Sequence, residues 1–131
     1  MSEKKKYEIE NLIKTSPKVL YNLIATPDGL SDWFADSVST NKENIFTFVW
    51  DGEEEKARLI FSKIGEGIRL QWLEDEENEL ETYFEFLMSP DPSDPKVCLL
   101  TITDFSEDDE MEESIMFWEN QISDLKRILG A

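Results

Sequence analysis

The chain has 131 residues, of which 40% are hydrophobic, so it is long enough to bury a sizeable core. Its 30 acidic residues against 13 basic ones give a net charge of −17. Nucleic acids and anionic membranes are bound through lysine and arginine, so this charge excludes both classes of partner. We expect no nucleic-acid partner and no membrane insertion, and we interpret the acidity as a source of solubility.

Cysteine content and apolar segments indicate the compartment. Cys98 is the only cysteine, so no internal disulfide can form and a reducing environment is expected. No run of about 18 apolar residues could span a bilayer, and no apolar signal-peptide core follows the N-terminal lysines. These features predict a cytoplasmic protein that forms a single domain over residues 1–131.

A strand and two short helices are predicted first. In residues 7–13 one set of positions, Tyr7, Ile9, Asn11 and Ile13, alternates with Glu8, Glu10 and Leu12, as in a half-buried strand. Residues 16–17 are Ser-Pro and residues 26–27 are Thr-Pro, each a helix N-cap followed by proline at the first helical position. The sequence therefore predicts two successive short helices, the second ending near Trp33 and Phe34.

Six more strands are predicted before the last element. They are expected at residues 35–40, 45–50, 56–64, 68–73, 80–88 and 97–105. Turn signals separate them: Asp51-Gly52, the glycines of residues 65–67, an acidic turn at 74–78, and three prolines within 89–95, which predict a loop. Short connections favour antiparallel pairing, with the first strand beside the last one.

A long amphipathic helix is expected from Ser106 to Leu129. Ser106 is a suitable N-cap, acidic residues fill the first turn, and Lys126 and Arg127 occupy the last turn. Apolar residues recur at steps of four and three and form one stripe: Met111, Ile115, Trp118, Ile122, Leu125 and Leu129. The predicted fold class is α+β, with a curved antiparallel sheet of about seven strands around this helix and two short helices after the first strand.

This element order, together with short sequence motifs, resembles a known superfamily. The motifs are Thr-Pro at 26–27, Gly-Leu-Ser-Asp-Trp-Phe-Ala-Asp at 29–36, and residues 46–52, 71–74, 103–105 and 118–121. The chain is similar to START-like domains of the helix-grip (pollen allergen/START) superfamily. It most resembles bacterial relatives of the co-chaperones that activate a heat-shock ATPase. The resemblance implies a helix-grip fold, often with an internal cavity for apolar molecules, and it implies no fixed chemistry.

Large apolar residues are the candidate lining of such a cavity. The candidates are Trp33, Phe34, Phe46, Phe48, Trp50, Leu59, Leu70, Trp72, Phe84, Phe86, Met111, Ile115 and Trp118. They could leave an apolar pocket between sheet and helix, or their rings could fill that space, since each aromatic buries about 150–250 Å². Trp33 and Phe34 are expected at the mouth of the cavity, where they would act as a gate or a plug.

Polar residues give few signals for chemistry. Alternation places Arg69 and Gln71 on the outer face of the sheet, opposite glutamates such as Glu85. The chain has no histidine, Cys98 is expected to be a packed thiol, and no acidic run has the spacing of a calcium loop. We therefore expect no metal and no cofactor, and the sequence identifies no catalytic residue.

Three functions are compatible with these observations. The first is a non-catalytic binding domain for a small apolar or amphipathic ligand, held between the sheet and the C-terminal helix. The second is a protein-interaction domain that resembles the co-chaperone activators. The third is a cyclase-like enzyme that uses a carboxylate inside the cavity, and an inward carboxylate with a raised pKa beside open volume would favour it.

Overall fold

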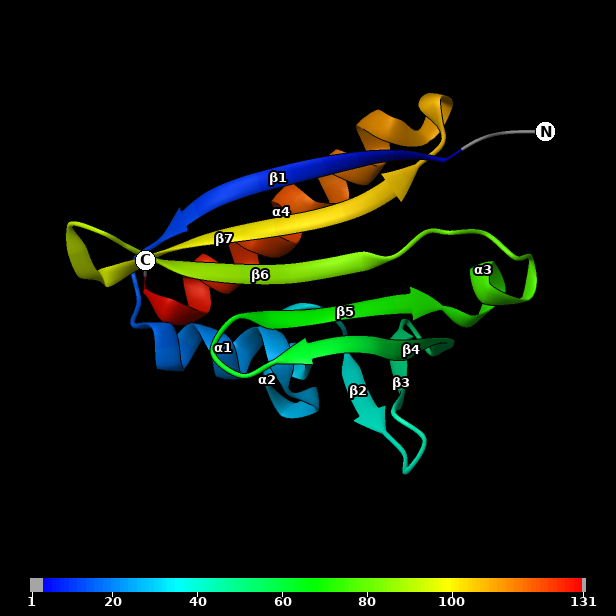
Figure 1. Ribbon diagram of the computed structural model, residues 1–131, viewed down its shortest axis with the longest axis horizontal. Coiled ribbons are helices and arrows are strands. Elements are labelled where there is room, and N and C mark those ends of the chain that lie inside the picture. The colour runs from blue at the N-terminus through cyan, green and yellow to red at the C-terminus, as the bar shows by residue number, and fades with distance from the viewer. Residues whose placement is uncertain (1–3, 131) are drawn as a thin grey trace.

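The computed structural model describes residues 4–130, and Figure 1 shows their arrangement. The helices and strands in chain order are β1 (Lys5–Ile13), α1 (Pro17–Ala25), α2 (Pro27–Trp33), β2 (Ser37–Thr40), β3 (Ile45–Trp50), β4 (Glu53–Lys63), β5 (Gly67–Trp72), α3 (Leu73–Glu77), β6 (Phe84–Asp91), β7 (Asp94–Ser106), the 3-10 helix η1 (Asp108–Glu110) and α4 (Met111–Leu129). The seven strands form one antiparallel sheet in the order β1-β7-β6-β5-β4-β3-β2. The predicted α+β class is confirmed, and so is the pairing of the first strand with the last.

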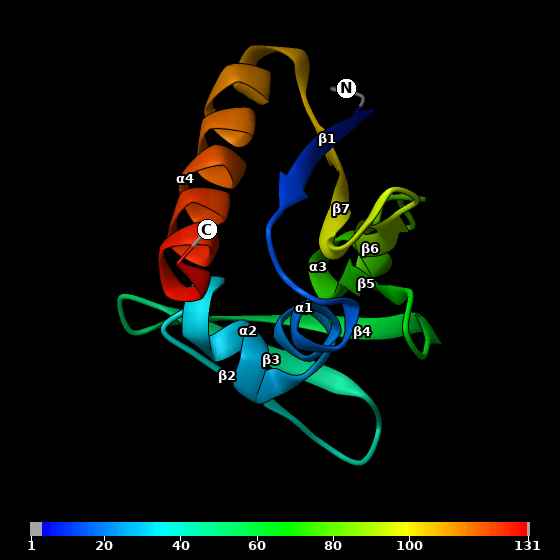
Figure 2. The same ribbon diagram turned by 90° about the vertical axis from the view of Figure 1, so that its left-hand side faces the viewer.

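The sheet is strongly curved, and Figure 2 shows α4, α1 and α2 on its concave side. Trp118, Ile122 and Leu125 of α4 are 2%, 3% and 0% exposed, so the predicted apolar stripe does face the sheet. Met111 and Ile115, nearer the start of the helix, are only half-buried. The helix α4 is therefore most deeply buried from Trp118 onward, where it packs against α2 as well as the concave face of the sheet. Within residues 4–130, none of the helices has the length and apolarity needed to cross a membrane.

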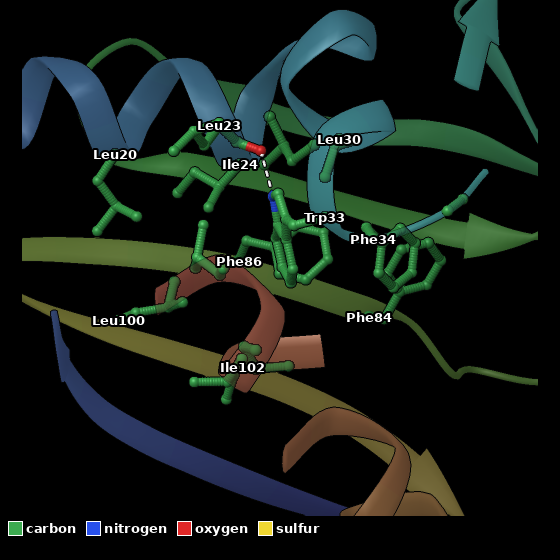
Figure 3. Packing of buried hydrophobic residues seen from close by; sticks show 14 of the residues in the cluster. Leu20, Leu23, Ile24, Leu30, Trp33, Phe34, Phe84, Phe86, Leu100 and Ile102 are labelled. Atoms are coloured by element: carbon green, nitrogen blue, oxygen red, sulfur yellow. Dashed lines mark hydrogen bonds between the residues drawn. The ribbon is translucent and has the colours of Figure 1, made fainter. Parts of the chain in front are cut away.

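The two short helices begin as predicted. Ser16 accepts a hydrogen bond from the Val19 amide at 3.3 Å, and Thr26 Oγ1 accepts one from the Gly29 amide at 3.0 Å. Gly29 also lets α1 and α2 approach closely, because a Cβ there would collide with the carbonyl oxygen of Asn22. The helices cover one end of the concave face and bury their apolar residues in the core (Figure 3).

The acidic turn predicted at residues 74–78 is instead the helix α3. Asp75 is 6% exposed, and its carboxylate accepts hydrogen bonds from Lys4 Nζ at 3.1 Å and Thr82 Oγ1 at 2.5 Å. These partners lie outside the acidic run, so local composition could not indicate the helix. The following strand is also shorter at its start than predicted, because β6 begins at Phe84 and not at Leu80.

The segment 89–95, predicted to be a loop, is largely strand and forms a tight hairpin. Strand pairing continues as far as Asp91 and Asp94, and Pro90 lies opposite Cys98. The carboxylate of Asp91 accepts hydrogen bonds at 2.8 Å from both the amide and the hydroxyl of Ser93. This side-chain bonding closes the turn, as aspartate commonly does.

The start of the last helix differs from the prediction. Ser106 is the final residue of β7 and donates a hydrogen bond to the Glu107 carbonyl at 3.1 Å, so it is not the N-cap of α4. The short helix η1 intervenes, and α4 begins at Met111. The predicted end is confirmed, since Gly130 adopts φ +69°, a left-handed conformation typical of a helix C-terminus.

Candidate ligand-binding site

The pairing register identifies which side chains point to the concave face. Residues directly opposite each other in antiparallel strands project to the same side of a sheet. Phe48, which is fully buried, lies opposite Glu55, and Trp72 lies opposite Ala57 in the same part of the sheet. Glu55 is therefore a carboxylate on the concave face, next to the aromatic residues.

A cavity of about 210 Å³ lies between this part of the sheet and α4. It is lined by Phe34, Trp50, Glu55, Trp72, Asp104, Phe117 and Trp118. We refer to it as the aromatic cavity. Its walls combine five aromatic rings with two carboxylates, and none of its lining residues is basic.

The rings form a continuous wall from the sheet to the helix. Trp72 and Trp50 have ring centroids 6.3 Å apart, and Trp50 packs against Phe34 at 5.2 Å. Phe34 in turn stacks on Trp118 at 5.3 Å with an interplanar angle of 8°. Phe117, which is 38% exposed, packs at 5.2 Å against Trp118 and at 6.3 Å against Trp50. The wall is thus buried on the α2 side and open to solvent at Phe117.

A second hollow of about 530 Å³ adjoins the aromatic cavity. It is lined by Lys4, Glu54, Glu55, Lys56, Trp72, Leu73, Glu74 and Asp75. Glu55 and Trp72 belong to both linings, so they stand at the boundary between the two spaces. Charged side chains dominate this adjoining hollow, which makes it a polar neighbour of the aromatic cavity.

The predicted lining residues fall into three groups. Phe34, Trp50, Trp72 and Trp118 line the aromatic cavity. Trp33, Phe46, Phe48, Leu70, Phe84 and Phe86 are buried in the core. Leu59, Met111 and Ile115 are half-buried and lie outside the set that lines the cavity.

Trp33 and Phe34 take different roles although they are adjacent in sequence. Trp33 is 4% exposed, and its indole N–H donates to the Leu23 carbonyl at 2.7 Å, as Figure 3 shows. Its ring packs edge-on against Phe86 at 5.7 Å. This geometry favours the filling interpretation for Trp33, whereas Phe34 forms the floor of the aromatic cavity.

Asp104 connects three elements at the aromatic cavity. Its Oδ2 accepts a hydrogen bond from Trp118 Nε1 at 3.0 Å and a longer one from the Tyr7 hydroxyl at 3.4 Å. Its Oδ1 accepts from the Phe105 amide at 2.8 Å. The Tyr7 hydroxyl also hydrogen-bonds to Ser114. Strands β1 and β7 are thereby tied to α4 through one carboxylate.

Burial raises the pKa of two residues of this network, Asp104 and Tyr7. It raises the pKa of the Asp104 carboxyl, although hydrogen bonds from Phe105, Trp118 and Tyr7 oppose the shift. Burial is also the main cause that raises the pKa of Tyr7 to about 12. Tyr7 therefore keeps its proton at neutral pH and can donate to Asp104.

The indole N–H groups of Trp50 and Trp118 donate hydrogen bonds within the protein. Trp118 donates to Asp104, and Trp50 Nε1 donates to the Phe34 carbonyl at 2.9 Å. Gln121 Nε2 donates to the same carbonyl oxygen at 2.5 Å. These two indoles therefore present only ring carbon atoms to the aromatic cavity. The polar atoms that a ligand could contact there are mainly the carboxylate oxygens of Glu55 and Asp104.

Sequence reasoning missed three lining residues: Glu55, Asp104 and Phe117. A signal for Asp104 was present, because Cys98, Leu100 and Ile102 alternate on the concave face and Asp104 is the next residue of that series. Glu55 could be placed only once its strand was paired with Phe48. Phe117 lies off the apolar stripe of α4 and gave no signal.

Other polar predictions concern the outer face and the core. Arg69 Nε donates to Glu85 at 2.6 Å, and the guanidinium lies 4.1 Å from the centre of the Tyr83 ring, which confirms the predicted cross-strand pairing. Cys98 is fully buried, and burial raises the pKa of its thiol. The thiol is therefore packed and unreactive, as the sequence predicted.

Comparisons with known proteins agree with this architecture. A protein from Bacteroides fragilis, solved by solution NMR, is 38% identical with a TM-score of 0.64, over 98% of this chain and 93% of its own. The Aha1 dimer from Colwellia psychrerythraea is 18% identical with a TM-score of 0.75, over 93% of each chain. DynU16, from the dynemicin biosynthetic locus, is 11% identical with a TM-score of 0.76, over 96% of this chain and 47% of its own.

Among curated proteins, none matches the sequence. The family profile that does match describes a START-like superfamily domain and covers residues 1–131. The curved sheet, the paired short helices and the long terminal helix are the features that this superfamily shares with the structures above. The chain therefore belongs to the START-like superfamily.

Proposed function

We propose that this domain binds a small amphipathic molecule without changing it chemically, with the apolar part of the ligand in the aromatic cavity. One observation carries the proposal: a space of about 210 Å³ remains between sheet and helix although nine of the predicted lining residues are aromatic and could have filled it. Ligand sites are typically apolar spaces with a few placed polar groups, and five rings with two carboxylates fit that description.

The size of the space limits the ligand. Sites for drug-sized molecules usually measure about 300–1,000 Å³, so the aromatic cavity alone suits a head group or a small aromatic molecule. The adjoining hollow of about 530 Å³ offers room for the rest of the molecule. Because its lining is largely charged, that remaining part is expected to be polar or exposed to water.

A titration with the neutral apolar dye N-phenyl-1-naphthylamine tests the proposal. We expect its emission to rise on binding and the ¹⁵N-indole signals of Trp50, Trp72 and Trp118 to shift. Trp33 is an internal control, because its N–H is bonded within the core at 2.7 Å from the Leu23 oxygen. A dye that binds without moving the three lining indoles, or that does not bind, would contradict the proposal.

Adjacent residues of α4 provide a matched pair of variants. Phe117 lines the aromatic cavity and is 38% exposed, whereas Met116 is 61% exposed and does not line it. Phe117→Ala removes one wall, so we expect the dye to bind about five- to tenfold more weakly, while Met116→Ala has no effect. Equal effects of the two substitutions on the dissociation constant would count against the site.

One observation favours an enzyme as the second candidate. Asp104 is a cavity carboxylate whose pKa is raised by burial, as expected of a general acid or base. Against this role, both of its oxygens accept hydrogen bonds from the protein itself, from Trp118 and Phe105. The arrangement suits a fixed structural carboxylate better than a mobile proton carrier, so binding is preferred.

Mass spectrometry of the ligand distinguishes the two candidates. A ligand recovered from the purified protein should keep its mass after prolonged incubation with fresh protein if the domain only binds it. A change in mass that is lost in Asp104→Asn would establish the enzyme instead.

The protein-interaction alternative has no observation in its favour. The likeness to the Aha1 dimer, at 18% identity, concerns the fold alone and does not support that alternative.

A further inference from the structure

The aromatic cavity has the chemical character of a site for a positive charge. Trp50, Trp72 and Trp118 belong to its wall, and tryptophan is the side chain whose ring face attracts cations best. Two of these indoles have their N–H groups bonded to the Phe34 carbonyl and to Asp104. Among the residues that the structure describes, no basic side chain lines the cavity to receive an anionic ligand.

The two carboxylates of the cavity have no basic partner in direct contact. Among residues 4–130, the lysine and arginine side chains within 4.0 Å of a carboxylate pair with other acids, and none pairs with Asp104 or Glu55. Lys4 exerts a favourable charge effect on Asp104, but its ammonium group is bonded to Asp75 at 3.1 Å. Glu55 is exposed, whereas Asp104 is half-buried. A half-buried carboxylate without a counter-ion in contact is costly, and a ligand cation would relieve that cost at Asp104.

The electrostatic field of the whole protein also favours a cationic ligand. With a net charge of −17, the protein raises the local concentration of cations and repels anions. At the cavity this general effect coincides with specific groups, because Glu55 stands at the boundary with an adjoining hollow whose lining contains Glu54, Glu74 and Asp75 together with the basic residues Lys4 and Lys56. With four carboxylates and two ammonium groups in the lining of that hollow, an anionic ligand would meet an excess of negative charge on its approach.

We propose that the ligand of this domain carries an alkylated ammonium group, which lies against the rings of the aromatic cavity with Asp104 and Glu55 as its counter-charges. This inference rests on the proposed binding function and specifies the class of ligand. Methylated ammonium suits the site better than a bare amine, since its methyl groups contact rings while its charge needs no hydrogen-bond acceptor.

Three probes of nearly equal shape and different charge test this inference. Choline, 3,3-dimethylbutan-1-ol and 3,3-dimethylbutanoate carry positive, zero and negative charge on comparable branched groups. Each is titrated against the ¹⁵N-indole signals of the four tryptophans. We expect choline to bind about fivefold or more tightly than the neutral alcohol, and the carboxylate to bind most weakly.

Matched charge variants locate the effect. Glu55→Gln removes a carboxylate from the cavity, and Glu10→Gln makes the same charge change at an exposed position of β1 that lies opposite Thr101. We expect Glu55→Gln to lower the affinity for choline several-fold and to leave the neutral alcohol unchanged. Glu10→Gln should change neither, and an equal loss in both variants would reduce the effect to the general field of the protein and overturn the proposal.

Phosphocholine distinguishes a simple ammonium compound from a lipid head group. It should bind more weakly than choline, because its phosphate would meet Glu55 and Asp104 at the cavity, and in the adjoining hollow four carboxylates outnumber Lys4 and Lys56. Binding as tight as that of choline would contradict a simple ammonium ligand.

The outcomes separate this inference from the proposed function. If the dye N-phenyl-1-naphthylamine binds but choline binds no better than the neutral alcohol, the cavity is a ligand site and the inference about charge is wrong. If neither the dye nor any charged probe moves the indoles of Trp50, Trp72 and Trp118, the proposed function fails as well.

Discussion

Asp104 belongs both to the proposed ligand site and to the hydrogen-bond network that stabilises the fold. It holds Trp118 of α4 by a hydrogen bond of 3.0 Å and also accepts one from Tyr7 of β1, so it fixes the helix relative to the far edge of the sheet. The same burial that makes it useful for orienting the cavity wall also disfavours its charged form. The domain therefore accepts a cost in stability at this position at neutral pH.

The pH dependence of stability follows from the direction of that shift. Because the pKa of Asp104 is raised in the folded state, the folded protein binds more protons than the unfolded chain between the unfolded pKa and the folded one. Its contribution to the free energy of unfolding therefore falls as pH rises through this interval, and below it the penalty is absent.

Asp104→Asn isolates this contribution. Urea denaturation at a series of pH values should show the stability of the wild type, relative to the variant, decreasing as pH rises through the carboxyl range. The slope of this difference against pH is the informative quantity, because the loss of hydrogen bonds in the variant lowers its free energy of unfolding by the same amount at every pH. A difference that is flat, or that increases with pH, would contradict a raised pKa.

The helix α4 combines two functions along its length. Its C-terminal half packs in the core through Ile122 and Leu125, which are 3% and 0% exposed. Its N-terminal half is less covered, with Met116 and Phe117 reaching 61% and 38% exposure, and it forms one side of the aromatic cavity. Stability is thus concentrated in one half of the helix and the proposed ligand contacts in the other.

Alanine substitutions measure this division. Leu125→Ala leaves a cavity in the core and should lower the free energy of unfolding by about 2–5 kcal/mol. Ile128→Ala, at a neighbouring position that is 49% exposed, should change it by no more than about 0.5 kcal/mol. Urea denaturation gives both values, and similar losses in the two variants would contradict the assigned packing of α4.

Elements set by local pattern could be predicted from the sequence, and elements set by distant contacts could not. The apolar stripe of α4 and the caps at Ser16 and Thr26 depend on residues within a few positions of one another. The helix α3 depends on contacts of Asp75 with Lys4, 71 residues away, and with Thr82. The residues around Asp75 in the sequence therefore do not indicate that Lys4 and Thr82 will contact it.

The candidate site shows the same division at the scale of the whole molecule. Phe34, Trp50, Trp72 and Trp118 were predicted because large rings on a periodic face are visible in sequence. Whether each ring lines a space or fills it is decided by packing between β3, β5 and α4, which no single segment encodes. Glu55 joins the site only through the register of two strands.

At the scale of the whole molecule, the central feature is the aromatic cavity between the sheet and α4. The curvature of the sheet separates it from the first half of α4, and the rings close most of the gap while leaving about 210 Å³ beside Asp104. A domain that served only as a packed scaffold would gain stability by filling that volume. The central claim is that this space holds the ligand.

Intermolecular nuclear Overhauser effects between bound choline and the protein test that claim most directly. We predict contacts from the choline methyl protons to ring protons of Trp72, Phe117 and Trp118, which face the aromatic cavity from opposite sides. Contacts only to exposed residues elsewhere, such as Ile64 in the turn that follows β4, or no contacts at saturating choline, would contradict the account.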